Sequence, residues 1–182
     1  ELISNKQQEI KIVSEKLDTI AAIISKARNT SIPKLTKELE NLLADLGMKH
    51  ARFSIKIKPT NNYFLNGKDE LAFLFSANKG GNFGDLKKVA SGGELSRIML
   101  SVKKVLSVNT QLPTIIFDEI DTGVSGEISN KIAAIMQQMS NHMQVIAITH
   151  LPQIAAKGRN HYKVYKEDID GVTNSNLKQL ST

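Results

Sequence analysis

The sequence contains no cysteine, and it has no long apolar run. Without cysteine the chain can form neither disulfides nor thiolate metal sites, which suits a reducing cytoplasm. Its longest apolar runs are far shorter than the roughly 20 residues that a membrane-spanning helix needs. We therefore expect a cytoplasmic protein without a membrane partner, and because residue 1 is glutamate, we expect a piece of a longer chain.

Two further absences bear on anionic ligands. No Gly-Lys-Ser or Gly-Lys-Thr occurs, so the glycine-containing stretch at residues 78–88 is not a phosphate-binding loop of the Gly-x-x-x-x-Gly-Lys-Ser/Thr kind and is expected to be a mobile loop. The net charge of +6 favours an anionic partner such as nucleic acid or nucleotide. The lysines are scattered, however, and no basic stretch is interleaved with aromatic residues for stacking on single strands.

Apolar residues recur at heptad spacing near the start of the chain. They predict a coiled-coil seam of about four heptads, roughly 40 Å of helix, that needs a partner helix. We expect a break at residues 29–33 and a second helix from Leu35 to Leu46, with Gly47 past its end. A helical hairpin that packs on itself is the alternative. The heptad residues are Ile3, Ile10, Val13, Leu17, Ile20, Ile24 and Ala27.

The period changes to two at Arg52. Alternation over residues 52–58 predicts a strand with one wet face, Asn66-Gly67 predicts a tight turn, and residues 71–76 predict the returning strand. We therefore divide the chain into a coiled-coil or helical segment at residues 1–47 and an α/β lobe at residues 48–182.

A helix is predicted to begin at Ser91. Ser91 and Glu94 have the spacing of a capping box, and apolar residues then recur at helical intervals up to Leu106. Gly92 and Gly93 leave the first-turn N–H groups uncovered, which suits a bound phosphate. The alternative is an ordinary capped helix, although two glycines after the cap lower helix stability by about 1 kcal/mol each relative to alanine.

The stretch from Thr114 to Asp121 is an apolar run that ends in acids. It predicts a short strand, buried on both faces of a parallel sheet, whose carboxyl end carries the acids. Asp118 is there a candidate Mg2+ ligand, and Glu119 a candidate group to orient or deprotonate a water that attacks phosphate. The alternative is a buried strand that leaves into an acidic turn.

A second buried strand is predicted at residues 145–149, after a loop at 121–126 and an amphipathic helix that Ser125 can cap. The strand-helix-strand order implies a parallel pair with a crossover. His150 then lies at the same sheet edge as Asp118 and Glu119, where it can bond to a phosphate oxygen. The alternative is a purely structural histidine at a strand end.

The order of these motifs resembles the second half of an ABC-type ATPase head. Ser-Gly-Gly-Glu, apolar-Asp-Glu, Asp-Thr-Gly and the strand closed by histidine are similar to the signature motif, Walker B, D-loop and H-loop. The heptads make the chain similar to the SMC-like branch, and residues 89–97, 116–126 and 147–155 resemble the RecN family of bacterial DNA repair proteins. The implied fold class is α/β, the C-terminal half of a P-loop NTPase-like head with helices flanking the sheet and an N-terminal coiled-coil segment.

The resemblance implies ATP and Mg2+ as cofactors. Asp118 is then the metal ligand, Glu119 activates water and His150 contacts the γ-phosphate. The signature residues, Ser91 to Glu94, contact the nucleotide held by the opposite head, and Asp121 lies at that same interface.

The resemblance also implies partners. Walker A and the Q-loop are absent, so we expect the chain to need its own N-terminal head segment, and to be inactive in ATP hydrolysis alone. The further partners are a second head, giving a homodimer around two ATP molecules, and DNA, with work on double-strand breaks in the nucleoid. The surface charge permits DNA binding, and the candidate contacts are Lys87, Lys88, Lys103 and Lys104. The alternative is that they are solvated lysines on a helix or loop.

Two other interpretations remain open. A non-catalytic dimerisation or DNA-tethering module keeps the fold without the chemistry, although Asp118, Glu119 and His150 are all present. A transporter's nucleotide-binding subunit predicts a helical insertion before the signature, where this chain has two predicted strands and a coiled coil.

Overall fold

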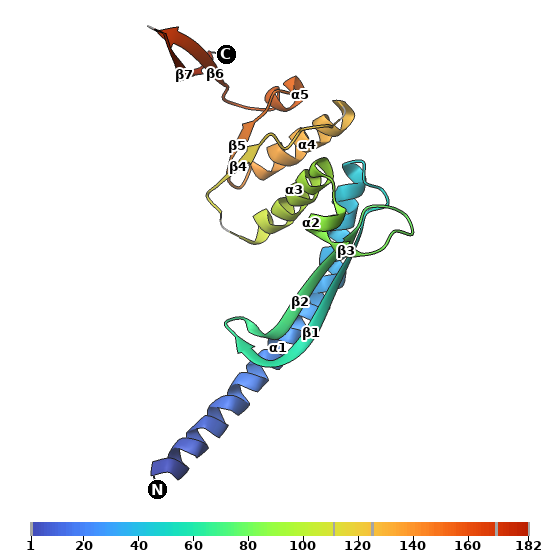
Figure 1. The fold of residues 1–182 in the computed structure, drawn as a ribbon, viewed down its shortest axis with the longest axis vertical. Coiled ribbons are helices and arrows are strands. Elements are labelled where there is room, and N and C mark those ends of the chain that lie inside the picture. The colour runs from blue at the N-terminus through green and yellow to red at the C-terminus, as the bar shows by residue number, and fades with distance from the viewer. Residues whose placement is uncertain (1, 111, 125, 170, 182) are drawn as a thin grey trace. The chain divides into compact units, whose positions relative to one another are not determined.

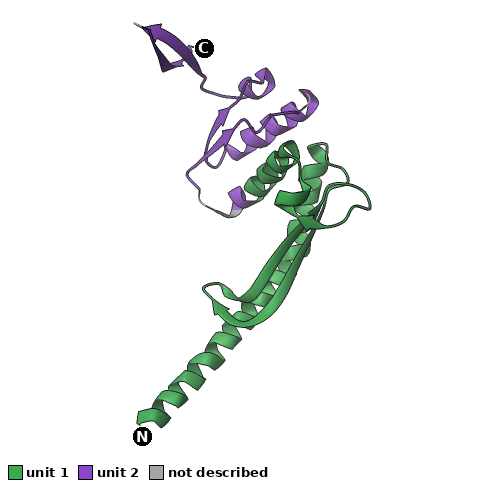
Figure 2. Cartoon of the chain, in the orientation of Figure 1, with its two compact units in different colours: residues 1–105 green, residues 106–182 purple. Residues whose placement is uncertain are grey.

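The computed structural model describes residues 2–110, 112–124, 126–169 and 171–181. The chain is α/β and separates into two compact units, residues 1–105 and residues 106–182 (Figure 2). The division into a helical segment at residues 1–47 and a lobe at residues 48–182 remains a prediction. The elements, in chain order, are α1 (Leu2–Asp45), β1 (Arg52–Phe64), β2 (Gly67–Ser76), β3 (Gly84–Asp85), α2 (Leu86–Val89), α3 (Gly92–Asn109), β4 (Thr114–Asp118), α4 (Gly126–Met139), β5 (Gln144–Ile148), α5 (Pro152–Ala155), β6 (Tyr162–Ile169) and β7 (Val172–Gln179).

The helix α1 is continuous, so the predicted break at residues 29–33 and the alternative helical hairpin are both wrong. Pro33 lies inside the helix, where it removes one backbone donor. The β1–β2 hairpin runs along α1 and holds it on both sides of this proline (Figure 1). Before it, Arg28 donates to Asp69 at 2.9 Å, and after it, Glu40 accepts from the Phe53 N–H at 3.0 Å. These contacts override the local break signal.

The end of α1 is as predicted. Gly47 adopts a positive φ of 85°, its N–H donates to Ala44 O at 3.1 Å, and the Met48 N–H donates to Leu43 O at 2.8 Å. This pair of bonds is a Schellman motif, which favours glycine because a Cβ disfavours the left-handed conformation.

The heptad row is mostly exposed over the first half of α1. Ile3, Ile10 and Leu17 are 75%, 66% and 42% exposed, whereas Ile24 is partly covered beside Gly67 of the hairpin. A row of large apolar side chains in water is unfavourable. The expectation that this seam pairs with another helix stays a prediction.

The hairpin forms at the predicted place but is longer than predicted. β1 and β2 pair antiparallel, and Phe64 lies opposite Gly67. Residues 78–88 are not all loop, since β3 pairs with β2, placing Gly84 opposite Phe75, and α2 follows at once. The prediction of a mobile loop is therefore wrong from Gly84 onward. The sequence does not reveal β3, because backbone pairing to β2 does not depend on a side-chain pattern.

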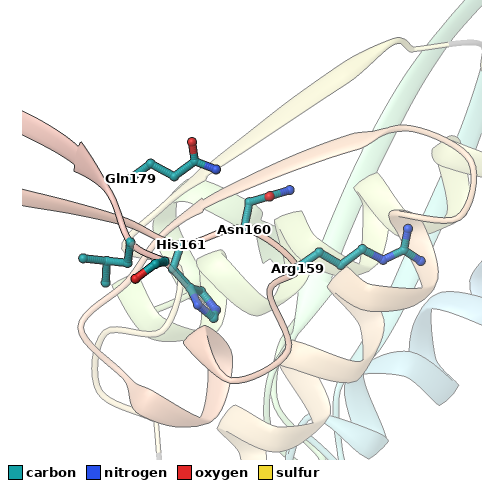
Figure 3. A pocket seen from close by; sticks show the side chains of 6 residues that line it. Arg159, Asn160, His161 and Gln179 are labelled. Atoms are coloured by element: carbon teal, nitrogen blue, oxygen red, sulfur yellow. The ribbon is translucent and has the colours of Figure 1, made fainter.

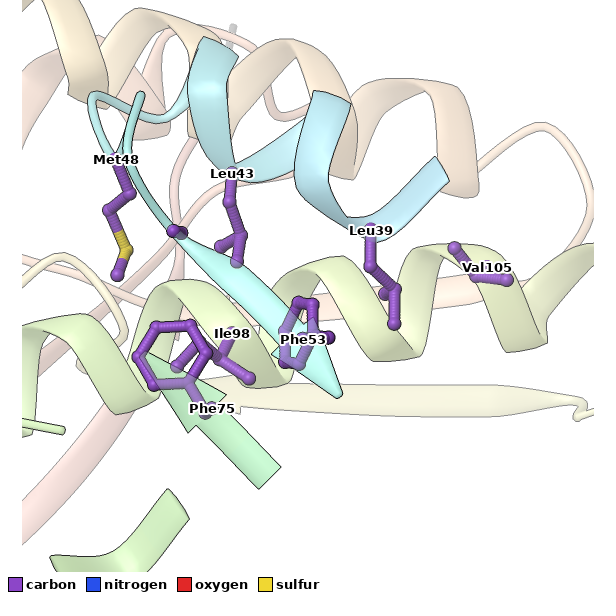
Figure 4. Close-up of a cluster of buried hydrophobic side chains, with 8 residues drawn as sticks. Leu39, Leu43, Met48, Phe53, Phe75, Ile98 and Val105 are labelled. Atoms are coloured by element: carbon purple, nitrogen blue, oxygen red, sulfur yellow. The ribbon is translucent and has the colours of Figure 1, made fainter. Parts of the chain in front are cut away.

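The core of unit 1 joins α1, the hairpin and α3 (Figure 4). The side chains come from elements that are far apart in the sequence. The ring centroid of Phe53 lies 5.2 Å from those of Phe73 and Phe75, with the rings tilted relative to each other. The core therefore fixes the start of α3 relative to the end of α1. Its buried members are Leu39, Leu43, Met48, Ala51, Phe53, Phe75, Ile98 and Val105.

Unit 2 contains the predicted parallel pair. β4 and β5 are parallel and in register over five residues, and α4 connects them. Two burial predictions are wrong. β4 is not buried on both faces, because Ile116 is 61% exposed while Ile115 and Phe117 are buried. β5 is not a buried strand either, because most of its residues are exposed. Ser125, expected to cap α4, lies outside the described residues. The β6–β7 hairpin ends the unit.

Candidate functional site

The carboxyl ends of β4 and β5 gather three predicted site residues at one edge. Asp118 is the last residue of β4 and pairs with Ile148, the last residue of β5. Glu119 follows β4 at once, and His150 follows β5 after Thr149, so both lie at the same edge. The side chains of Asp118, Glu119 and His150 are all exposed. In α/β sheets this edge is where ligands bind.

Glu119 has an unusual backbone conformation. It is the only non-glycine residue with a positive φ, 44°, in the described part of the chain. Its N–H donates to Ile148 O at 3.0 Å, and its carbonyl accepts from the N–H and hydroxyl of Thr122 at 3.3 and 2.9 Å. A left-handed conformation is strained for glutamate and persists only where surrounding bonds hold it.

Asp121 is buried, with 1% of its surface exposed. Its Oδ2 accepts a hydrogen bond from the Thr149 hydroxyl, and the Thr149 Oγ1 accepts from the Leu151 N–H at 3.0 Å. Among the described residues, Asp121 Oδ1 has no hydrogen-bond partner. The contact of Asp121 with an opposite head remains a prediction. Within this chain, the Asp121 carboxylate accepts a hydrogen bond from Thr149.

Sequence reasoning missed Thr149. The pattern marks it only as the last residue of an apolar strand, and a hydroxyl directly before the edge histidine is the available signal. No local pattern pairs it with Asp121, which lies 28 positions earlier in the chain.

The predicted capping residues meet at the start of α3, in unit 1. The Ser91 N–H and hydroxyl both donate to Glu94 Oε2, at 2.8 and 2.9 Å. Only half of a capping box is thus formed, because the hydroxyl donates to the carboxylate rather than accepting from the helix backbone. A Cβ added at Gly92 would meet no described atom within 4 Å, so packing does not require this glycine. The first turn therefore leaves space for a ligand.

The sheet edge offers few groups that could hold Mg2+. No cluster of three or more acidic or histidine residues exists among the residues that the structure describes. Mg2+ is commonly held by one or two carboxylates, with phosphate oxygens and water completing its shell. The exposed Asp118 at the strand end offers one such carboxylate, and its binding of Mg2+ stays a prediction.

A separate hollow of about 400 Å³ lies in unit 2 at the base of the β6–β7 hairpin (Figure 3). One ring nitrogen of His161 lies 2.9 Å from Ala155 O. The lining contains no predicted site residue. It consists of Arg159, Asn160, His161, Gln179, Leu180 and Ser181.

Comparison with known proteins identifies relatives along nearly the whole chain. No protein-family model matches it. The DNA repair protein RecN of Bacillus subtilis (strain 168) is 37% identical over 98% of this chain, and RecN of Deinococcus radiodurans is 35% identical over 96%. The chain is RecN-like. RecN of Xylella fastidiosa (strain Temecula1) is likewise 37% identical over 99% of the chain.

This RecN-like chain spans about a third of the length of those relatives, 35%, 31% and 31% respectively. Its similarity to RecN is therefore similarity to one segment of a longer protein.

Solved structures support the fold assignment. The Smc head domain with a coiled coil and joint from Pyrococcus yayanosii aligns over 98% of the RecN-like chain and 33% of its own, with a TM-score of 0.63 and 20% identity. The Pyrococcus furiosus Smc head, bound to the C-terminal domain of ScpA, aligns over 97% and 43%, with a TM-score of 0.60 and 17% identity. The fold is that of part of an SMC head with its coiled coil.

No helix in the described residues is long and apolar enough to cross a bilayer.

Proposed function

We propose that the chain supplies the carboxyl-terminal part of a RecN-like ATPase head that acts in DNA double-strand break repair and recombination. The observation that carries the proposal is the gathering of Asp118, Glu119 and His150 at one edge of the parallel β4–β5 pair. The sequence similarity to RecN along 98% of the chain supports it.

The roles of the edge residues follow from their chemistry. Asp118 contributes a carboxylate oxygen to Mg2+, which supplies positive charge that offsets the charge of the phosphates. Glu119 accepts a proton from, or orients, the attacking water. His150 donates a hydrogen bond to a γ-phosphate oxygen.

The signature residues act on a second nucleotide in this proposal. Ser91, Gly92 and Gly93 offer a hydroxyl and backbone N–H groups at the start of α3, and Glu94 holds the cap. The phosphate that they contact belongs to the opposite head, so two heads close over two ATP molecules. Asp121 belongs to the same interface in this proposal.

The chain needs partners to do this work. The phosphate cradle of Walker A comes from the protein's own N-terminal head segment, and the exposed Ile116 and Ile148 on the β4–β5 pair are consistent with a surface that another segment covers. DNA is the further partner, and the work is assigned to the cytoplasm and the nucleoid. One similar solved structure, at 19% identity and a TM-score of 0.53, comes from work on the ATP-driven dimerization and DNA-stimulated activation of SMC ATPases.

The test is ATP turnover by the chain together with the segment that precedes it in the full-length protein. Glu119→Gln should lower kcat by about 100-fold or more, because general acid–base groups contribute about 10²–10⁴-fold. Binding of ATP should persist. Glu127→Gln is the matched control, since Glu127 is an exposed glutamate of α4, paired only with Lys131 among the described ion pairs, and should leave turnover unchanged.

Undiminished turnover in Glu119→Gln would contradict the assignment. A wild-type assembly that binds Mg-ATP and never hydrolyses it would instead support the alternative, a nucleotide-gated dimerisation or DNA-tethering module.

A further inference from the structure

We propose that Thr149 and Asp121 are a positioning pair that sets Glu119 relative to His150 for ATP hydrolysis. The inference rests on the function proposed above and deepens it. Neither side chain needs to touch the nucleotide for this role. Thr149 precedes His150 by one residue, and Asp121 follows Glu119 by two, so a bond between them links the two edge loops directly.

The Thr149 hydroxyl is used on both sides. It donates its proton to Asp121 Oδ2, and its oxygen accepts the Leu151 N–H at 3.0 Å. The second bond spans His150 and therefore fixes the path of the backbone at that residue. One hydroxyl thus determines both where the β5 loop lies and how His150 leaves the strand.

The other side of the pair is a constrained turn. The Glu119 N–H is held by Ile148 O at 3.0 Å, and the turn is closed by Thr122, whose N–H and hydroxyl both donate to Glu119 O. Glu119 keeps a φ of 44° within this turn. A strained backbone conformation persists only where several bonds hold it. The Asp121–Thr149 bond joins this turn to the neighbouring loop through two side chains.

Loss of the hydroxyl would have a specific consequence. Asp121 Oδ1 already has no partner among the described residues. Without the Thr149 hydroxyl, Oδ2 would lose its donor too, and the buried carboxylate would keep neither oxygen paired in the way seen here. A buried charged acceptor without a partner is strongly unfavourable, and the loop should move to relieve it. A displacement of about 1 Å at reacting groups can lower a rate about 100-fold.

The experiment uses the full-length protein and compares Thr149→Val with Thr149→Ser. Valine has nearly the shape of threonine and lacks the hydroxyl, whereas serine keeps it. We expect Thr149→Val to lower kcat by about 10- to 100-fold with KM and ATP affinity unchanged within about twofold, and Thr149→Ser to recover most of kcat.

Thr114→Val is the matched control. Thr114 also bridges β4 and β5, donating to Gln144 Oε1 at 2.9 Å, but at the opposite end of the same strands. The Thr114→Val variant loses a hydrogen bond between the two strands without disturbing the edge that carries Glu119 and His150. Its kcat should therefore match that of the wild type.

Wild-type kcat in Thr149→Val overturns the proposal, and so does a loss of kcat that Thr114→Val shares. If Thr149→Val does not fold, Thr149→Ala takes its place. Failure of both to fold, while Thr149→Ser folds, also overturns it, because the hydroxyl is then required for stability alone. Glu119→Gln is measured in parallel. Loss of turnover in Glu119→Gln beside an active Thr149→Val rejects only the positioning pair, whereas full turnover in Glu119→Gln rejects the role proposed for Glu119 at this site.

Discussion

The guanidinium of Arg97 connects the start of α3 to the end of α1. Its Nη1 donates to Leu46 O at 3.1 Å, and its Nε donates to Gly93 O at 3.1 Å. Leu46 is the residue at which the Schellman motif closes α1, and its carbonyl is one that the helix itself leaves unpaired. One side chain therefore satisfies a helix end in the long helix and contacts the glycine turn of the signature-like motif.

Arg97→Ala should destabilise unit 1 by about 1–3 kcal/mol, because it leaves the Leu46 carbonyl without its charged donor. Chemical denaturation of the chain measures this as a change in the free energy of unfolding. Arg97→Lys is the matched variant: it keeps the charge but lacks the forked donors, so it should recover only part of the loss. Equal stability of Arg97→Ala and wild type would show that water replaces the guanidinium without penalty.

Glu119→Gly should make the fold more stable while abolishing the proposed turnover. Glycine adopts a positive φ without a Cβ penalty, so relief of the strain at φ 44° should raise the free energy of unfolding by about 1 kcal/mol relative to Glu119→Gln. Both variants lack the carboxylate, and only the glycine variant relieves the backbone. Thermal unfolding of the two proteins side by side makes the comparison, and a less stable glycine variant would contradict the inference that Glu119 is strained.

The contact between the hairpin tip and α1 should depend on pH in a defined way. Asp18 Oδ1 accepts hydrogen bonds from Lys68 Nζ and from the Tyr63 hydroxyl, both at 2.8 Å. The bond from Lys68, followed by that from Tyr63, lowers the pKa of the Asp18 carboxyl. The bond to Asp18 raises the pKa of both Tyr63 and Lys68.

The signs define a window for this contact. A lowered carboxyl pKa contributes stability that is present above the ordinary aspartate pKa, about 3.9, and is lost as pH falls below it. Raised pKa values of Tyr63 and Lys68 contribute stability below their ordinary values, about 10, that is lost as pH rises through the shifted values. Stability from this cluster should therefore be constant between about pH 5 and pH 9.

Tyrosine absorbance tests the alkaline side, since the chain has no tryptophan to obscure it. Subtracting the titration of Tyr63→Phe from that of wild type isolates the Tyr63 phenol. We expect its ionisation to shift to lower pH in Asp18→Asn, which removes the negative charge. An unchanged Tyr63 titration in Asp18→Asn would mean that this hydrogen bond is not populated in solution.

Some of the candidate site could be predicted from sequence because its signals are local. The apolar strand ending in Asp118 and the strand ending before His150, with a helix between them, imply parallel strands whose ends meet at one edge. The structure confirms that arrangement. It also shows the role of Thr149, which no spacing rule predicts, because its partner Asp121 is near it only after the sheet has formed.

The sequence by itself determined the features that depend on neighbouring residues. The reversal near Asn66-Gly67 and the end of α1 at Gly47 follow from short-range hydrogen bonds and from the freedom of glycine at positive φ. Only the tertiary structure decided that α1 continues through Pro33, that Ile116 remains exposed, and that Thr149 binds Asp121. Each of these depends on contacts between distant segments, whose free energy outweighs the local preference of the chain.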